Sequence, residues 1–233
     1  MVNIDTVYQR VLALANKEQR GYITPLEYNL LANQAQLDVF EQYFYDRNQT
    51  ARGPGNATHF SDVDSMLDEK ISVFEVSALT SNGLIPIGAY RLGSIITAPP
   101  LKPVEVEKVT AKELLYRVSP LLKPTDLRPI YVRTNNTVQI FGTNNVDLAL
   151  GLNTAVMNYV QQPVKVEWGY DVIGEKALHN GSPNKTTHFQ HHPSEETKLV
   201  IKILELAGVI IQDPGLIQYA DGEDMKKIQQ EKQ

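Results

Sequence analysis

The longest regular pattern of apolar and polar positions in the chain lies between Gly21 and Thr50. A helix start is indicated by Thr24, Pro25 and Glu27. The threonine can cap a free backbone N–H, and the proline suits the first helical position. The glutamate completes a capping box with the threonine. The pattern predicts a helix of about 24 residues, roughly 36 Å long. Its apolar side chains recur at helical spacing, which places them on one face: Leu26, Leu30, Leu37, Phe40 and Phe44.

This apolar face is longer than the neighbouring helix can cover. Residues 4–18 predict a first, shorter amphipathic helix, and the short turn between the two helices favours antiparallel packing. About half of the long face would then stay uncovered, so we expect it to contact other copies of the chain. Tyrosines are enriched here, and both core packing and an interface explain them. The candidates for an inter-subunit interface are Tyr28, Leu30, Leu37, Phe40, Tyr43 and Phe44.

Short β-like runs separated by Pro, Gly and Asn predict a small β-rich domain over residues 71–170. The clearest hairpin is PIYVRT-NN-TVQIF, in which Asn135 and Asn136 tolerate the positive φ of a tight turn. Thr110 and Glu113 form a second capping box, which predicts a short helix inserted in this domain.

The C-terminal part of the chain predicts one more helix. Ser194 and the two glutamates after it suit a helix start, and Gly208 suits the helix end. The polar tail beyond it would stay solvated or order against a partner. The predicted fold is therefore α+β, with an N-terminal helical hairpin and a third helix (1–70), a central β-rich domain with its inserted helix (71–170), a long polar loop (171–193), a C-terminal helix (194–212) and an extended polar tail (213–233).

Composition narrows the class of protein. The chain has 233 residues, 42% of them apolar, and its net charge of -5 disfavours broad binding to nucleic acid or anionic membranes. It has no cysteine, which excludes disulfides and thiolate metal sites. The sequence has neither a signal-peptide pattern nor a stretch near the ~20 apolar residues of a membrane span. We therefore expect synthesis in the cytoplasm and no membrane partner.

The histidine cluster HFQHH is the one candidate for a metal site in the sequence. Because no further ligand stands at a recognisable metal spacing, we interpret it as an interfacial group in a polar loop. Phosphate-binding glycine motifs and the hydrolase G-x-S-x-G motif are absent from the sequence. We predict no catalytic residues, no metal, no cofactor and no enzyme activity. The candidates for docking a partner are His188, His191, His192, Leu216 and Tyr219.

Three blocks of the sequence carry a resemblance to a known family. They are LANKEQRGYITPLEYNLLANQAQLDVFEQYFYDRNQ (14–49), PVKVEW (163–168) and HPSEETKLVIKILELAGVIIQDPGLIQYA (192–220). These blocks resemble the head-to-tail adaptor, ring or tail-stabilisation proteins of short-tailed bacteriophages, especially the crAss-like phages. None of the three is a catalytic motif, so no catalytic residue is carried over from the family.

The resemblance implies a structural protein of the virion, located at the tail and portal vertex and made in the host cytoplasm. Such a protein forms a homo-oligomeric ring, expected to be a dodecamer, on the portal protein. The ring extends the DNA channel used in DNA ejection and seats other ring or tail proteins. Double-stranded DNA passes through it without specific binding. An acidic net charge suits this role, because DNA must slide through without its phosphates being held.

Two other functions stay open at the level of the sequence. One is a phage-encoded metal-dependent hydrolase that uses the HFQHH loop. The other is a head-decoration or cargo protein of the same virion. Stoichiometric metal in the purified protein would favour the hydrolase, and the position of the protein in virus particles separates the other two functions.

Overall fold

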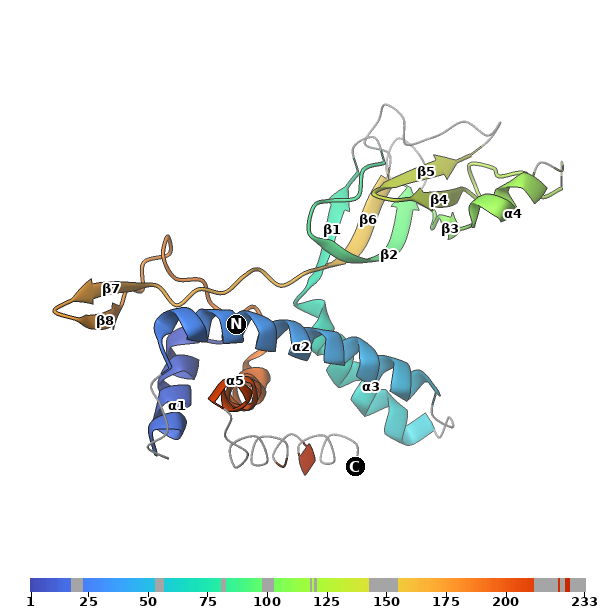
Figure 1. The fold of residues 1–233 in the computed structure, drawn as a ribbon. Coiled ribbons are helices and arrows are strands. Elements are labelled where there is room, and N and C mark those ends of the chain that lie inside the picture. The colour runs from blue at the N-terminus through green and yellow to red at the C-terminus, as the bar shows by residue number, and fades with distance from the viewer. Residues whose placement is uncertain are drawn as a thin grey trace. The chain divides into compact units, whose positions relative to one another are not determined.

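The chain folds into two units in the computed structural model. The structure describes residues 1–17, 23–52, 57–80, 83–97, 103–117, 119, 121–142, 155–211, 222 and 225–226. We call Met1–Val73 together with Pro163–Gln233 the helical unit, and Phe74–Gln162 the β unit. The chain combines helices with sheets and is α+β, as the sequence predicts (Figure 1).

Helices α2 and α5 form the centre of the helical unit. α2 begins at the predicted capping box, where Glu27 accepts a hydrogen bond from the backbone N–H of Thr24 at 2.9 Å. α5 packs against α1 and α2, and α3 packs against α2. Fully covered apolar side chains such as Val11, Phe40 and Ile203 form the core between them. The helices are α1 (Ile4–Lys17), α2 (Pro25–Arg52), α3 (Ala57–Ser72), the 3-10 helix η2 (Pro193–Glu195) and α5 (Glu196–Ile211).

The packing of α1 corrects the predicted antiparallel hairpin. Figure 1 shows α1 running across α2 rather than alongside it. Tyr8 of α1 meets Tyr28 of α2 with ring centroids 4.5 Å apart, and the Tyr28 hydroxyl donates to the carbonyl of Ile4 at 3.2 Å. α5, with its buried Leu199 and Ile203, packs against α2, and so does α3, so two helices besides α1 contribute to covering α2.

The β unit contains two three-stranded sheets. In the first, β6 lies between β1 and β2 and is antiparallel to both. In the second, β4 is antiparallel to β5 and parallel to the short β3, which leads into helix α4. The strands and helix are β1 (Glu75–Leu79), β2 (Ala89–Thr97), β3 (Glu107–Lys108), α4 (Ala111–Tyr116), β4 (Ile130–Thr134), β5 (Thr137–Phe141) and β6 (Ala155–Gln161). One apolar core joins both sheets: Ile85, Ile95, Val106, Tyr131, Val138, Ile140, Ala155, Met157 and Tyr159.

Two local predictions for the β unit are confirmed. The β4–β5 hairpin turns at Asn135, which has a φ of 52°. The capping box of α4 is present: the Thr110 side chain accepts from the backbone N–H of Glu113, and the Glu113 side chain accepts from the backbone of Thr110. In both cases a short run of residues specifies the conformation.

The boundaries of the β-rich region differ from the prediction. Residues from Pro163 onward belong to the helical unit, although the sequence extends the β-rich region to residue 170. The predicted loop 171–193 contains a hairpin of β7 (Tyr170–Ile173) and β8 (Lys176–His179). α3, the predicted third helix, extends to Ser72, two residues past the predicted boundary at 70. Most of the predicted tail, 213–233, lies outside the described residues.

Candidate functional site

The segment that leads into the β7–β8 hairpin is held along α2 by side-chain amides. Asn29 accepts a hydrogen bond from the backbone N–H of Trp168 at 2.8 Å and donates to its carbonyl at 3.4 Å. Asn33 makes the same pair of bonds with Val166, at 3.0 and 2.9 Å. The side chains of α2 therefore take the place of a neighbouring β-strand, because an amide offers both a donor and an acceptor.

Gln36 continues this series by donating to the carbonyl of Val164 at 2.9 Å. One helical turn rises about 5.4 Å, and two residues of extended chain rise about 6.6 Å, so successive turns of α2 meet alternate residues of the segment. The segment runs antiparallel to α2 as a result. We call the three side chains the amide ladder: Asn29, Asn33 and Gln36.

Trp168 fixes the base of the hairpin. Its side chain is buried, and its indole N–H donates to Oδ1 of Asp5 at 2.9 Å. Its ring centroid lies 4.4 Å from that of Tyr8, and the ring stacks on His179 at 5.4 Å. Because Asp5 and Tyr8 belong to α1 and the amide ladder belongs to α2, two helices hold this base in place.

Gly169 lets the chain pass close to Lys185 at the base of the hairpin. A Cβ atom at Gly169 would lie 2.6 Å from the carbonyl carbon of Lys185, so the backbone would have to move. We expect Gly169→Ala to lower the free energy of unfolding of the helical unit by about 1–3 kcal/mol, as overpacking does. Gly181→Ala is the control, since its Cβ would lie an ordinary 3.6 Å from Cε1 of His179. Denaturant unfolding compares the two variants, and equal stabilities would contradict the crowding.

The β7–β8 hairpin extends beyond the helices of its own unit (Figure 1), and we call residues 170–179 the arm. Gly174 and Glu175 have φ values of 56° and 65°, as a two-residue type I′ turn requires. Such a turn matches the right-handed twist of the two strands. Val172 and Ile173 are consecutive in β7, so their side chains point to opposite faces of the arm.

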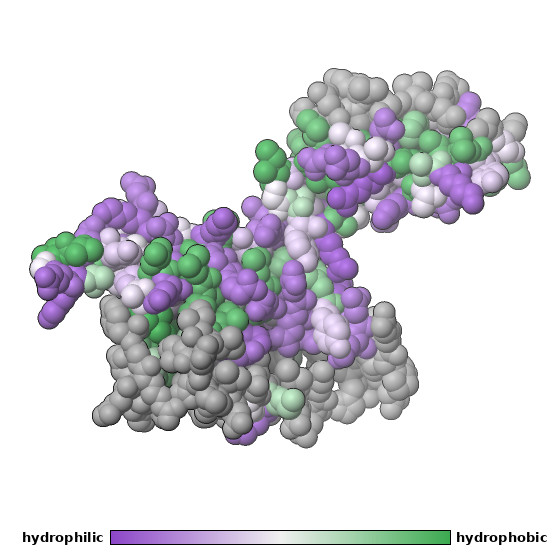
Figure 2. All heavy atoms as spheres, in the orientation of Figure 1, coloured by the Kyte–Doolittle hydropathy of each residue, from purple (hydrophilic) through white to green (hydrophobic). Residues whose placement is uncertain are grey.

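The end of the arm is apolar on both faces. Val172, Ile173 and Leu178 are 69%, 63% and 50% exposed, and we call them the arm tip. Figure 2 shows hydrophobic side chains gathered at the outer end of the arm. Burial of their exposed parts would stabilise a contact by about 3–5 kcal/mol. Because association also costs translational and rotational freedom, a contact of this size alone does not hold two free proteins together.

Most of the predicted interface on α2 is buried inside the helical unit. Tyr28, Phe40, Tyr43 and Phe44 are at most 8% exposed, and Leu37 is partly exposed. These four aromatic side chains are corrected from interface candidates to core residues, because the chain itself covers them. About half of the predicted apolar face is nevertheless uncovered within the chain, because Leu26 and Leu30 are exposed while Phe40 and Phe44 are buried.

Leu30 is the predicted interface residue with the largest exposed fraction, 68%. Leu26, one turn earlier, is 66% exposed, so the two side chains are neighbours on the helix surface. We call Leu26 and Leu30 the α2 patch. At 100° per residue, the patch lies on the helix face next to the amide ladder. It therefore lies beside the segment that carries the arm.

A buried group of charged side chains joins α3 to η2. Nζ of Lys70 lies 2.9 Å from Oε1 of Glu195, and the two side chains are 10% and 1% exposed. Lys198 of α5 is also buried, with Nζ 6.0 Å from the ring centroid of Tyr43. Buried charges are costly unless they are paired, so this arrangement fixes how α3 meets η2. We call the group the buried ion cluster: Lys70, His191, Glu195 and Lys198.

His191 is fully buried, which corrects its prediction as a docking residue. Its ring centroid lies 6.1 Å from that of Tyr43. Burial lowers the pKa of His191 to about 4, and the negative charge of Glu195 opposes this shift only in part. The side chain is therefore neutral at pH 7.

The helical unit is expected to lose stability as the pH falls, because of His191. The pKa of this histidine is about 4 when folded and near 6.5 when unfolded, so the unfolded chain binds more protons between these values. The stabilising contribution is complete above pH 6.5 and is lost as the pH falls towards 4, by up to about 3 kcal/mol. His191→Leu should remove this dependence. Denaturant unfolding at pH 7 and pH 5 tests this, and an equal loss in both proteins would contradict it.

The remaining docking candidates have structural roles or lie outside the described residues. Nδ1 of His188 accepts from the backbone N–H of Ile4 at 3.4 Å. Nδ1 of His192 accepts from the backbone N–H of Ser194 at 3.3 Å and caps η2. The histidines of HFQHH therefore have separate surroundings instead of one shared site. Across the described part of the chain, no group of three metal-ligating side chains is found. Leu216 and Tyr219 are outside the described residues.

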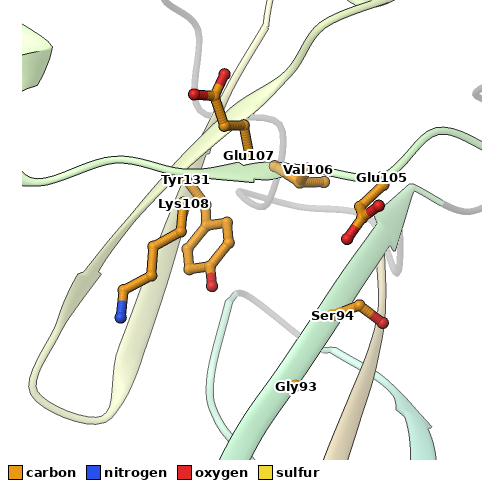
Figure 3. A pocket seen from close by; sticks show the side chains of 7 residues that line it. All are labelled: Gly93, Ser94, Glu105, Val106, Glu107, Lys108 and Tyr131. Carbon is orange, nitrogen blue, oxygen red and sulfur yellow. The ribbon is translucent and has the colours of Figure 1, made fainter. Parts of the chain in front are cut away.

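An open depression of about 440 Å³ lies between β2 and β3 of the β unit (Figure 3). Figure 3 shows Lys108 beside Tyr131, while Glu107 points away from the hollow. Glu107 instead accepts two hydrogen bonds from Arg117, at 2.8 and 3.1 Å.

The polar side chains of the depression are already engaged within the β unit. Oγ of Ser94 accepts from the side-chain amide of Asn158 at 2.9 Å. Burial raises the pKa of the Tyr131 hydroxyl. We assign no reaction to this depression. Its described lining is Gly93, Ser94, Glu105, Val106, Glu107, Lys108 and Tyr131.

The fold and the site together define an α+β protein with a rigidly held, apolar-tipped arm. No family model matches the chain, and no curated protein has significant sequence similarity to it. In the stretches that the structure describes, none of the helices has the length and apolarity that a bilayer span needs.

Sequence reasoning missed both the arm and the amide ladder. The arm has a local signal in YDVIGEKALH, where a glycine at the turn position separates an apolar pair from an alternating strand. The amide ladder has no local signal, because Asn29, Asn33 and Gln36 have the pattern of an exposed polar face.

Proposed function

We propose that this chain is a structural subunit of the head-to-tail connector of a short-tailed bacteriophage. In this proposal it forms a ring, expected to be a dodecamer, that is attached to the portal protein. The ring extends the DNA channel and seats the next ring or tail proteins. It has no catalytic role and acts through contacts with other proteins of the virion.

The arm is the observation that carries the proposal. It exposes three apolar side chains at its end, while its base is fixed by the amide ladder and by Trp168. An exposed apolar group on a rigid support is typical of a surface that binds another protein. The resemblance of residues 14–49, 163–168 and 192–220 to connector proteins supplies the particular assembly.

A single arm contact is weak, and a ring assembly is compatible with weak contacts. Three side chains bury far less than the roughly 1,200–2,000 Å² of a stable interface, so one such contact is too weak for a stable dimer at ordinary protein concentrations. On a portal, however, neighbouring subunits are held together, and each contact then forms at a high effective concentration. Weak contacts of this kind are therefore sufficient to close a ring of subunits bound to the portal. They do not cause the free protein to aggregate.

The net charge of the chain is compatible with a passive DNA channel. A charge of -5 gives the protein no overall attraction to phosphates. We therefore expect no retardation of double-stranded DNA in a gel at physiological salt. Sequence-independent binding under these conditions would argue against a channel through which DNA slides.

The test is reconstitution with the portal protein encoded in the same genome. The two purified proteins are mixed, sedimented through a gradient and imaged by electron microscopy. The proposal expects co-sedimentation with one bound subunit for each portal subunit, and added ring density at one end of the portal. Failure of the two proteins to associate, with the portal intact by microscopy, would reject the proposal.

A further inference from the structure

We propose that an apolar and basic surface of the β unit binds an acidic face of α3 in the next copy of this chain. This inference rests on the proposed ring and adds a contact between its neighbouring subunits. The contact is heterologous, because it joins two different surfaces, and repetition of such a contact gives a ring where the rotation closes. It is separate from the arm tip, which belongs to the helical unit.

A run of exposed apolar side chains lies in α4 and in the loop that follows it. None of the six residues of α4 is buried, although Leu115 and Tyr116 are apolar and are 73% and 70% exposed. Five exposed apolar side chains within 13 positions are more than the single ones scattered over an ordinary surface, so they are typical of a binding site. We call them the α4 surface: Leu115, Tyr116, Leu121, Leu122 and Leu127.

Positive charge surrounds the α4 surface. Residues 111–129 contain four basic and two acidic residues, in a chain whose net charge is -5. Lys112 shares one face of α4 with the two apolar side chains of that helix, which lie three and four positions later. Lys123 and Arg128 are exposed in the loop. The surface is therefore apolar and basic at once.

This composition indicates the class of partner. Anionic lipid surfaces are bound by clusters of about four to eight basic residues, and the two acidic residues here leave a smaller charge. Nucleic acid is held through its phosphates, which basic groups contact but which would leave the five apolar side chains without a partner. A protein face that is both acidic and apolar covers both kinds of side chain.

The exposed face of α3 has this acidic and apolar composition. Met66, Glu69 and Val73 follow one another at steps of three and four positions, which places them on one side of the helix. Met66 and Val73 are 54% and 45% exposed, and the exposed carboxylate of Glu69 lies between them. Asp64 is exposed on the same helix. We call Met66, Glu69 and Val73 the α3 face.

The charges of the two units favour a contact between different copies. The β unit has eight basic and six acidic residues, whereas the rest of the chain has 14 basic and 21 acidic residues. Unlike charges favour the pairing of a β unit with the helical unit of another copy over the pairing of like units. Lys112 with its apolar neighbours on α4 then faces Glu69 with its apolar neighbours on α3. The partner is therefore a second copy of the chain.

Disulfide trapping tests the contact, since the chain has no cysteine of its own. Two single variants, Leu115→Cys and Met66→Cys, are mixed and oxidised without the portal. In the control mixture, Leu14→Cys of α1 takes the place of Met66→Cys. Leu14 is 40% exposed, so the control measures random collisions. A disulfide stays closed without a reducing thiol, so oxidation accumulates a weak contact in its linked form.

We expect about tenfold more of the linked pair 66–115 than of the control pair, because a specific contact holds the two cysteines at a high effective concentration. Equal yields in the two mixtures would overturn the inference. A chain that carries both substitutions should give linked multimers. An intramolecular disulfide in that chain would also overturn the inference, since its own α3 face would then cover the α4 surface.

Charge reversal tests whether the two surfaces are complementary. Lys112→Glu in the Leu115→Cys chain, or Glu69→Lys in the Met66→Cys chain, should each lower the yield of the linked pair about fivefold, because a like pair of charges replaces an unlike pair. Both positions are exposed, so the variants should fold normally. The two reversals together restore an unlike pair and should restore the yield. A yield that neither reversal changes, or that the combination lowers further, would contradict the contact.

The inference and the proposed function fail in different ways. A protein that binds the portal as a ring but gives no linked pair above the control keeps the function and loses the contact. A protein that gives the linked pair but does not bind the portal keeps the contact and loses the function.

Discussion

Glu195→Gln is expected to lower the free energy of unfolding of the helical unit by about 3–5 kcal/mol, because it removes one partner of a buried ion pair. The Glu195 carboxylate is 1% exposed and lies 2.9 Å from Nζ of Lys70. The substitution keeps the shape of the side chain but removes the negative charge that faces the buried ammonium of Lys70. A loss of this size lowers the melting temperature by about 10 °C.

Glu196→Gln is the matched control for this prediction. Glu196 is the next residue in the chain and pairs with Arg10 at 2.7 Å, but both side chains are partly exposed. Solvent screens such a pair, so we expect a loss below about 1 kcal/mol. Denaturant unfolding of both variants at pH 7 measures the difference. Similar losses in the two variants would show that burial does not determine the strength of the Lys70–Glu195 pair.

The double substitution Val172→Asp with Ile173→Asp is expected to abolish ring formation on the portal. It places a carboxylate on each face of the arm, and a charge buried in an apolar contact costs more than the contact contributes. The melting temperature should stay within about 2 °C of the original, because exposed residues contribute little to folding. Co-sedimentation with the portal measures the occupancy of the ring.

Lys176→Asp is the control for the charge that these substitutions add. It changes the net charge by the same amount, at an exposed position in the same hairpin, and it leaves the arm tip apolar. We expect this variant to reach the original occupancy. A double variant that still forms complete rings, or a Lys176→Asp variant that fails equally, would exclude the apolar arm tip as the contact.

Structural features specified by a few neighbouring residues could be predicted from the sequence. Thr24 and Glu27 form the predicted capping box, with the Thr24 hydroxyl 3.3 Å from the backbone N–H of Glu27. The α4 capping box and the β4–β5 turn at Asn135 are equally local. In each case the interaction spans a few residues, so its energy can be judged from the residue types alone.

Features that depend on distant residues could not be predicted in this way. Lys70 and Glu195 pair across 125 positions, and each has the ordinary pattern of an exposed helical charge. Asn33 looks like part of a solvated face, yet it binds the backbone of Val166. Burial of a helix face is recognised in a sequence from the periodic spacing of apolar residues. Polar side chains that are buried by pairing with backbone do not contribute to this apolar pattern, so their burial cannot be recognised from it.

The candidate site was predicted only in part for the same reason. The sequence predicted a long polar loop over 171–193, and all but the first residue of the arm lies within it. The docking residues chosen there were histidines, and the most buried of them, His191, is in the core. On α2, periodicity placed Phe40 and Phe44 correctly among apolar contacts but could not show that they are covered within the chain while Leu26 and Leu30 stay exposed.

Electron cryomicroscopy of the portal vertex in intact virions tests the central claim most directly. The account predicts a ring of this chain on the portal, with the helical unit fitting the density and each arm tip covered by a neighbouring protein. Density for this chain on the capsid surface or inside the head, or its absence from purified particles, would contradict the account.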